Sequence, residues 1–164
     1  MAQKIKHPFP PIYSKDSKVL ILGSFPSVKS RENNFFYGHP QNRFWKVVSS
    51  VLNCPTPQSI PQKSEFLLNH SIALWDVIAS CDIEGSSDSS IKNVTPNDLT
   101  EILSSANIKQ IFTNGRTAEK YFTKYTQPVI GRKSICLPST SPANAAWSAD
   151  RLIDEWCIIM KYIL

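Results

Sequence analysis

Four short apolar runs divide the chain, and segments of a different pattern lie between and after them. The runs at residues 19–22, 72–78, 108–113 and 134–137 have the length and apolar content of buried strands. Apolar residues recur at helical spacing in the segments that follow. Strands that alternate with helices predict a three-layer α/β/α architecture with a central, mainly parallel four-stranded sheet.

Start and stop signals indicate where the helices lie. Asn42 is suited to cap a helix over residues 44–52, which ends before Pro55. A second helix is expected to start with Thr95 as its cap and Pro96 at its first position. Further helices are expected after Pro61, over residues 118–125 and from about residue 148.

Length and composition favour one globular domain over residues 1–164. The chain has 164 residues, of which 41% are hydrophobic, enough to bury a core. Residues 1–17 are expected to form an extended N-terminal arm ahead of the first strand, with His7 facing solvent. The sequence has neither an apolar run long enough to span a membrane nor an apolar signal core, so we expect a cytoplasmic protein.

The loops after the four predicted strands converge on one edge of the sheet. In open α/β sheets, ligands bind in the crevice outside the carboxyl ends of the strands. The polar segment 84–90 is expected to follow the second strand directly and to form a functional loop. The segments that meet at this edge are residues 23–42, 75–90, 113–116 and 138–144.

Motifs for several kinds of chemistry are missing from the sequence. It has neither the G-x-S-x-G of α/β-hydrolases nor the H-E-x-x-H of zinc enzymes, and no glycine-rich nucleotide loop. The four cysteines are widely spaced, without the C-x-x-C pairs that hold zinc or an iron–sulfur cluster, so we expect reduced thiols. The sequence therefore predicts no metal and no cofactor.

Aromatic and neutral polar residues gather after the first strand. Their rings are suited to stacking on a planar heterocycle, and a nucleobase is the obvious candidate. The loop P-S-T-S-P-A-N at 138–144 offers hydroxyl and backbone N–H groups to phosphates. A net charge of +5 also suits a polyanionic partner. Counter-charge near the site is expected from Lys29, Arg31, Arg43, Arg132 and Lys133.

Several of these segments resemble motifs of the uracil-DNA glycosylase superfamily, in the same order along almost the whole chain. G-S-F-P-S at 23–27 resembles its water-activating first motif, and L-P-S-T-S-P-A-N at 137–144 resembles its DNA-gripping second motif. H-P-Q-N-R-F-W at 39–45 is similar to a segment of mismatch-specific uracil/thymine glycosylases. The hypoxanthine-DNA (deoxyinosine) glycosylase branch is most similar, with G-S-x-P-G, Y-x-H-P-x-N-x-F-W and L-W-D-V-x-x-S-C.

The resemblance, taken with the positions of the strand ends, implies a set of site residues. The catalytic residues are expected to be Asn42 and His39. The substrate-binding residues are expected to be Gly23, Ser24, Phe25, Pro26, Phe36, Tyr37, Asp76 and Asn114. The DNA-binding residues are expected to be Ser27, Pro138, Ser139, Thr140, Ser141 and Asn144.

One departure from the family pattern bears on the mechanism. Phe25 stands where uracil-specific members have Asp and mismatch-specific members have Asn, and a phenyl ring neither orients water nor bears charge. The hypoxanthine branch assigns that role to the Asn of H-P-x-N, which is Asn42 here. Its carbonyl oxygen would aim the attacking water, and His39 would donate to the departing base. Ser27 stands where that branch usually has Gly.

Simpler structural roles stay open for the same residues. Asn42 is also suited to a role as helix cap only, and His39 to a role in the turn before Pro40. Asp76, at the end of a predicted strand, is of a type that often binds turn amides. Asn114 with the following glycine is typical of a plain turn.

The resulting hypothesis is a monofunctional DNA glycosylase that flips out and excises a deaminated base, hypoxanthine first. Its partner would be double-stranded DNA containing a damaged or mismatched base, and the protein is expected to be a monomer without membrane contact. Alternatives are a mismatch-specific uracil/thymine glycosylase, a DNA-damage-binding module without cleavage, and a hydrolase of free nucleosides. The second motif favours a polymeric substrate.

Overall fold

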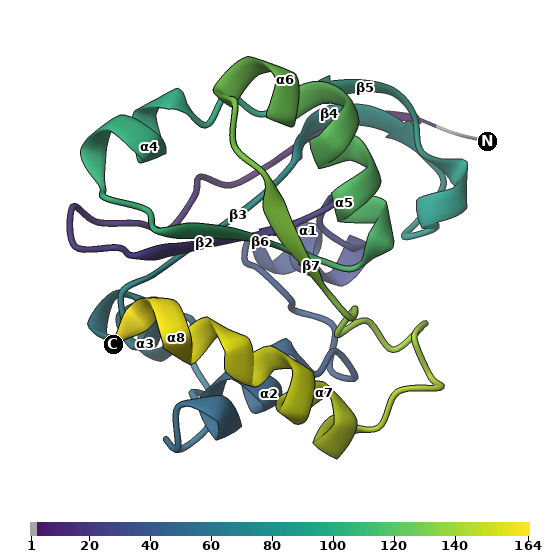
Figure 1. The fold of residues 1–164 in the computed structure, drawn as a ribbon. Coiled ribbons are helices and arrows are strands. Elements are labelled where there is room, and N and C mark those ends of the chain that lie inside the picture. Colours follow the sequence, from purple (N-terminus) through teal and green to yellow (C-terminus); the bar gives the residue numbers. More distant parts are fainter. Residues whose placement is uncertain (1–2) are drawn as a thin grey trace.

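A central parallel sheet and a smaller antiparallel sheet organise the structure, a computed structural model that describes residues 3–164 (Figure 1). The central sheet has the strand order β3-β2-β6-β7, and every neighbouring pair is parallel. Its strands are β2 (Val19–Gly23), β3 (Ile72–Asp76), β6 (Gln110–Asn114) and β7 (Ser134–Leu137). The antiparallel sheet consists of β1 (Gln3–Lys6), β4 (Ile78–Ile83) and β5 (Lys92–Pro96), in the order β1-β4-β5.

Helices cover both faces of the central sheet (Figure 1). On one side lie α2 (Phe44–Val51), α3 (Ile60–Asn69), α7 (Ala149–Trp156), η3 (Cys157–Ile159) and α8 (Met160–Ile163). On the other lie α4 (Thr100–Ser105), α5 (Arg116–Tyr121), the π-helical turn η2 (Phe122–Thr126) and α6 (Gln127–Ile130). The short helix α1 (Val28–Asn33) and the 3₁₀ turn η1 (Asp88–Ser90) belong to loops near the strand ends.

The alternation of side chains along β2 explains the two-sided core. All five residues of this strand are buried, as expected for a central parallel strand. Val19 and Ile21 pack in the core with α2, α3 and α7, whereas Leu20 and Leu22 pack in the core with α4 and α5. The predicted three-layer architecture with a central four-stranded parallel sheet is therefore confirmed, and β7 has the predicted bounds.

The predicted second strand is in fact two strands in different sheets. The apolar run at 72–78 continues past the end of the parallel sheet, so its pattern alone gives no boundary. The chain leaves that sheet after Asp76, and the backbone N–H groups of Val77 and Ile78 then donate to the carbonyls of Gly23 and Ser24. Consequently β4 lies between the end of the predicted strand and the polar loop 84–90.

The predicted helix start at Thr95 is wrong. Thr95 and Pro96 belong to β5, which pairs with β4 through an irregular register, and this pairing takes precedence over the local capping pattern. The helix begins later, at Thr100, where the Asp98 carboxylate accepts from the Thr100 backbone N–H at 2.9 Å. Arg43, rather than the expected Asn42, is the cap residue of the helix over Phe44–Val51, but Asn42 does bind the helix start, since its Oδ1 accepts from the Phe44 backbone N–H at 2.9 Å.

Residues 3–17 of the predicted N-terminal arm follow the edges of both sheets, and residues 1–2 lie outside the described part of the chain. The arm's β1 pairs with β4, and further along Ile12 exchanges backbone hydrogen bonds with Leu74 of β3 at 2.9 and 2.8 Å. The prediction that His7 faces solvent is wrong, because only 4% of its side chain is exposed. The arm's path along the two sheets turns the imidazole inward.

Candidate active site

A cavity of about 500 Å³ lies at the carboxyl ends of the central strands. Gly23 of β2, Asp76 of β3 and Asn114 of β6 all line it, so it occupies the edge where open α/β sheets bind ligands. The sequence-predicted residues that line the cavity are Gly23, Ser24, Phe25, Pro26, Ser27, Tyr37, His39, Asn42, Asp76, Asn114, Ser139, Thr140 and Ser141.

Three predicted site residues, Phe36, Pro138 and Asn144, do not line the cavity and instead make contacts elsewhere in the fold. Phe36 is buried in the core, where its carbonyl accepts from the Trp45 indole N–H at 3.3 Å. The carbonyl of Pro138 accepts from the Trp156 indole N–H at 2.9 Å. The amide of Asn144 donates to the Ser139 carbonyl at 3.0 Å, so it shapes the loop that lines the cavity.

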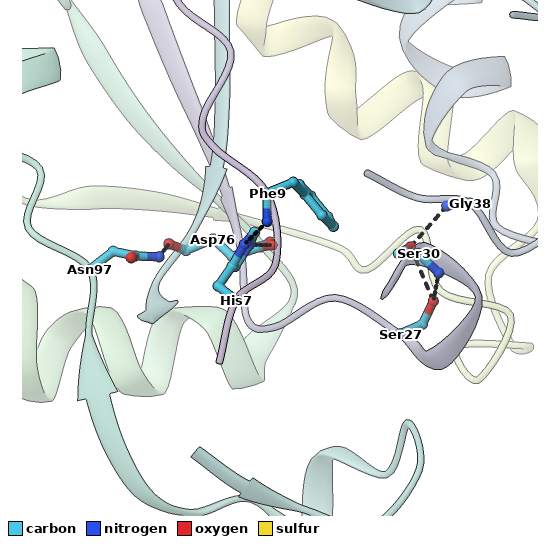
Figure 2. Close-up of polar contacts among 7 residues, drawn as sticks. All are labelled: His7, Phe9, Ser27, Ser30, Gly38, Asp76 and Asn97. Atoms are coloured by element: carbon cyan, nitrogen blue, oxygen red, sulfur yellow. Dashed lines mark hydrogen bonds and ion pairs between the residues drawn. The ribbon is translucent and has the colours of Figure 1, made fainter. Parts of the chain in front are cut away.

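Some lining residues were absent from the sequence-based set. The polar loop 84–90, expected to be functional, contributes Ser86, Ser87, Asp88 and Ser89 to the wall. Ser30 also lines the cavity, where its hydroxyl accepts from the Gly38 backbone N–H at 2.9 Å (Figure 2). No motif marked Ser30, because its place at the cavity depends on a contact between α1 and Gly38 rather than on a periodic pattern.

A chain of hydrogen bonds ties four predicted residues together. The Asn114 amide donates to the Tyr37 hydroxyl at 3.1 Å and to the Thr140 hydroxyl at 3.0 Å, and its oxygen accepts from the Thr140 backbone N–H at 3.1 Å. Thr140 in turn donates to Oδ1 of Asn42 at 2.9 Å. Both amide hydrogens of Asn114 are thereby engaged, so this residue fixes its neighbours in place.

The Asn42 amide is held in one orientation. Its Oδ1 accepts two hydrogen bonds, from the Phe44 backbone N–H and from the Thr140 hydroxyl, which occupy both of its lone pairs. Within residues 3–164, its Nδ2 has no hydrogen-bond partner, while the residue lines the cavity. The donor side of the amide is therefore available to a ligand.

Asp76 brings a carboxylate to the end of β2. It pairs in register with Gly23, and a Cβ on Gly23 would lie 2.4 Å from Asp76 Oδ1. The other oxygen, Oδ2, lies 2.7 Å from Nε2 of His7 (Figure 2). The backbone carbonyl of Asp76 accepts from the Asn97 amide at 2.9 Å. Only a glycine at position 23 allows this close approach of the carboxylate.

Two aromatic side chains form walls of the cavity. Phe25 is 9% exposed, and the Arg31 guanidinium lies 5.7 Å from its ring centre. Tyr37 has a positive φ of 52° and stacks on Phe44 at a centroid distance of 4.2 Å. Burial raises the pKa of the Tyr37 phenol, and the charge of Asp76 raises it further. Tyr37 is therefore a neutral hydroxyl at physiological pH.

His39 lines the same cavity in a defined tautomeric state. Its Nδ1 accepts from the Gln41 backbone N–H at 3.1 Å, so a neutral ring carries its hydrogen on Nε2. Within the described part of the chain, Nε2 has no hydrogen-bond partner. The ring can therefore donate one hydrogen bond to a bound molecule.

The loop 138–147 is anchored on Arg43. The guanidinium donates to the carbonyls of Ser141 at 3.0 Å, Asn144 at 3.1 Å and Trp147, and the Arg43 backbone N–H donates to Thr140. The positive charge of Arg43 therefore lies against the loop carbonyls, and its role as counter-charge to DNA stays a prediction.

The described residues place no cluster of metal-type ligands anywhere. Among residues 3–164, no group of three His, Cys, Asp or Glu side chains comes together. The four cysteines are free thiols. Residues 3–164 also include no helix that is long and apolar enough to cross a membrane.

Comparison with known proteins gives consistent matches over nearly the full length. The family model for the uracil DNA glycosylase superfamily matches residues 10–158. A protein from Methanosarcina acetivorans named hypoxanthine DNA glycosylase is 32% identical over 163 residues, covering 96% of this chain and 99% of that protein. A protein of the same name from Methanosarcina barkeri is 33% identical over 145 residues, covering 85% and 88%.

A solved structure has the same fold. The solution NMR structure of a candidate uracil DNA glycosylase from Methanosarcina acetivorans matches with a TM-score of 0.80 at 32% identity, covering 98% of this chain and 99% of that one. The motifs at the strand ends, the three-layer fold and the family match all agree. The chain belongs to the uracil DNA glycosylase superfamily.

Proposed function

We propose that this protein is a DNA glycosylase that removes hypoxanthine from double-stranded DNA and leaves an abasic site. The superfamily and the similar proteins named hypoxanthine DNA glycosylase support a glycosylase of this kind. The observation that carries the choice of base is the carboxylate of Asp76 in a cavity that also holds Phe25 and the N–H donor His39.

The chemistry of deamination explains why a carboxylate suits hypoxanthine. Deamination of adenine replaces its amino group with a carbonyl and places a hydrogen on N1. An ionised carboxylate only accepts hydrogen bonds, so Asp76 accepts from N1–H of hypoxanthine but faces a lone pair at N1 of adenine. A site built to pair with a substrate N–H strongly rejects an analogue that lacks it. The flipped base stacks on Phe25 meanwhile.

His39 favours departure of the base by donating to it, and Asp76 contributes by strengthening that hydrogen bond. The hydrogen bond from N1–H to the carboxylate pushes electron density into the purine ring, which makes N7 a better acceptor for Nε2–H of His39. The oxygen of a water molecule bonds to C1′ as the C1′–N9 bond breaks, and a proton from that water ends on the base. A preorganised donor of this kind stabilises the negative charge that develops on the departing base without reorganisation.

Asn42 holds the attacking water in this mechanism. The family resemblance assigns that role to Asn42, and we expected its carbonyl oxygen to aim the water, but this oxygen already accepts from Phe44 and Thr140. The unpartnered Nδ2–H₂ group therefore donates to the water oxygen and leaves a lone pair of the water free to attack C1′. Because an amide is not a base, the contribution of Asn42 is positioning.

The second-motif loop grips the DNA backbone. Ser139 Oγ accepts from the Ser141 backbone N–H at 3.1 Å, and Ser141 Oγ accepts from the Ala143 backbone N–H at 3.1 Å. Both hydroxyl hydrogens are left to donate to phosphate oxygens, which fix orientation without reading sequence. This grip offsets the cost of flipping the nucleotide, about a few kcal/mol and smallest for a mispaired base.

A substrate panel tests the proposal. Excess protein is incubated with labelled duplexes that contain one inosine, uracil, xanthine or T·G mismatch, and alkali then reveals abasic sites as strand breaks. We expect the fastest cleavage at inosine. Asn42→Ala should lower the single-turnover rate there by about 100-fold, whereas Asn69→Ala, an exposed amide at the end of α3, should not change it.

Three results would contradict the proposal. Preferred cleavage of uracil or T·G duplexes would instead support the mismatch-specific activity, which the shared H-P-Q-N-R-F-W segment favours. Binding to damaged duplexes without any cleavage would support a module that only recognises DNA. Full activity of Asn42→Ala on inosine would exclude the water-holding role of that residue.

A further inference from the structure

The histidine of the N-terminal arm, His7, contacts the proposed base-reading carboxylate. It lies outside the residues that match the superfamily model, which begin at residue 10. It also lies 69 positions before Asp76 in the sequence, and no motif joins the two. Their juxtaposition is a property of the fold of this chain, in which the arm follows the edges of both sheets (Figure 1).

The His7–Asp76 pair is short and buried. Nε2 of His7 lies 2.7 Å from Oδ2 of Asp76, and the two side chains are 4% and 5% exposed (Figure 2). The Phe9 backbone N–H donates to Nδ1 of His7 at 3.4 Å, which makes Nδ1 an acceptor. The hydrogen of the neutral ring is therefore on Nε2, from which it is donated to the carboxylate.

Aromatic rings fix the plane of the imidazole. The Phe9 ring lies edge-on at a centroid distance of 4.6 Å, and Phe25, the proposed stacking platform, lies at 6.0 Å with an interplanar angle of 87°. Phe36 and Trp75 lie at 6.1 and 6.4 Å. These surrounding rings hold the imidazole in the orientation from which it donates to the carboxylate.

The backbone of the arm is anchored on both sides of His7. Its own N–H donates to the Ala79 carbonyl at 2.7 Å, and the paired hydrogen bonds of Ile12 with Leu74 follow five residues later. Neither the arm nor the ring is free to swing away from Asp76. A side chain held in this way can impose a fixed rotamer on its partner.

We propose that His7 is a positioning residue for base recognition, an inference that rests on the proposed function. By donating to Oδ2, the imidazole holds the Asp76 carboxylate with its other oxygen against Gly23 at the cavity. Without this donor, the carboxylate loses its partner in a buried site, and its orientation toward the flipped base is no longer fixed. His7 acts only through Asp76 and makes no contact with the substrate.

Single-turnover kinetics on the inosine duplex test this role. His7→Leu should lower the cleavage rate by about 100-fold, the cost of displacing a positioned group by roughly an ångström, while the Kd for the duplex changes less than threefold. His7→Gln, which keeps an N–H donor, should recover at least a tenth of the wild-type rate. Lys6→Leu, an equally apolar change at an exposed neighbouring position, should leave the rate unchanged.

A double-mutant cycle separates positioning from a purely structural role. In an Asp76→Ala background, His7→Leu should have no further effect on the rate, because the residue through which it acts is gone. Nitrogen NMR of the wild-type imidazole should show hydrogen on Nε2 and none on Nδ1. Circular dichroism and the melting temperature identify any variant that does not fold. If His7→Leu does not fold, His7→Gln replaces it in the cycle.

Failure of the proposed role of His7 can be distinguished from failure of the proposed function. A wild-type protein that cleaves no duplex would overturn the proposed function itself. An active wild type with His7→Leu and His7→Gln both within threefold of its rate would overturn the role of His7 alone. That role would also be overturned if the His7→Leu and Asp76→Ala effects multiply, since His7 would then act independently of the carboxylate.

Discussion

At the scale of single residues, one close approach explains the first glycine of G-S-F-P-S. Gly23 has no unusual backbone conformation, so the glycine is required by its surroundings. A Cβ there would lie 2.4 Å from Oδ1 of Asp76 and 3.0 Å from the Tyr37 hydroxyl. The absence of a side chain at position 23 is thus what admits the carboxylate of the neighbouring strand to the cavity.

Gly23→Ala should therefore disable the site while leaving the fold in place. The new methyl group must displace the Asp76 carboxylate, which His7 holds from the other side. We expect the single-turnover rate on inosine to fall by about 100-fold. Overpacking should also lower the free energy of unfolding by about 1–3 kcal/mol, which urea denaturation measures.

A second glycine provides the matched control. Gly131 ends α6 with a φ of +69°, and no heavy atom lies within 4 Å of a Cβ placed on it. Gly131→Ala should cost stability, about 1–2 kcal/mol for the left-handed backbone, with an unchanged rate. Wild-type activity in Gly23→Ala would show that the carboxylate has room to move, and that its placement is not critical.

Residue-level prediction from the sequence succeeded where a motif or a local pattern existed. Asn42 lies two residues before the first residue of a helix, within a recognisable segment, and both its hydrogen bond to the helix start and its place at the cavity follow from that. His7 has only lysine and proline beside it, with no periodic apolar pattern to indicate burial. Its partner is 69 residues away, a contact that only the assembled sheet edges create.

At the scale of elements, the loop 138–147 owes its shape to α2 as well as to its own turns. Arg43, the residue before α2, gathers the carbonyls of Ser141, Asn144 and Trp147 in one guanidinium fork. A planar guanidinium offers five donors in fixed directions, whereas an ammonium acts as a point charge. The DNA-gripping loop and the Asn42 segment are therefore linked as one unit.

Arg43→Lys should loosen this loop although the charge is kept. Hydrogen bonds to a charged donor contribute about 1.5–3 kcal/mol each, so we expect the free energy of unfolding to fall by about 2 kcal/mol. The Kd for duplex DNA should rise about tenfold, measured by fluorescence anisotropy. Lys46→Ala removes a full charge from an exposed site in α2 and reports the effect of charge alone. A smaller effect of Arg43→Lys than of Lys46→Ala would contradict the anchoring role.

Elements were predictable from the sequence as far as their signals were local. The central strands and the final helix have clear apolar patterns, and Ser148 caps α7 where the pattern begins. The strand β5 has mostly exposed and half-buried residues and ends at Pro96, so its sequence favoured a helix start. Its strand state comes from pairing with β4, a partner that the local pattern cannot reveal.

At the scale of the whole molecule, the cavity is formed by two parts of the fold, a buried sheet and an exposed loop. Its floor belongs to the buried parallel sheet, whereas one wall is the exposed loop 84–90 of the antiparallel part. Asp88 is exposed as a residue but also lines the cavity, where partial loss of surrounding water raises the pKa of its carboxyl, and the charge of Asp76 adds to the rise. The hydroxyls of Thr117 and Ser24 counteract it only in part.

The raised pKa of Asp88 predicts a pH-dependent gain in stability for Asp88→Asn. A carboxyl whose pKa is higher in the folded than in the unfolded protein destabilises the fold once it is ionised. This free-energy cost is absent when the pH is below the pKa of the carboxyl in the unfolded protein, about 4. It is complete when the pH is above the pKa of the carboxyl in the folded protein. Asp88→Asn should therefore have a higher free energy of unfolding than wild type at neutral pH, and the gain should vanish as the pH falls below about 4.

Asp98 provides a control of opposite sign, because hydrogen bonds from Thr100 lower its pKa. Asp98→Asn should reduce stability at neutral pH, and its deficit should also vanish in acid. Urea denaturation at neutral pH and below about pH 4 measures the free energy of unfolding of both variants. A gain for Asp88→Asn that is independent of pH would show that ionisation is not its cause. A pH-dependent gain would mean that the cavity wall keeps a charge at the expense of stability, as is common where binding loops meet a rigid core.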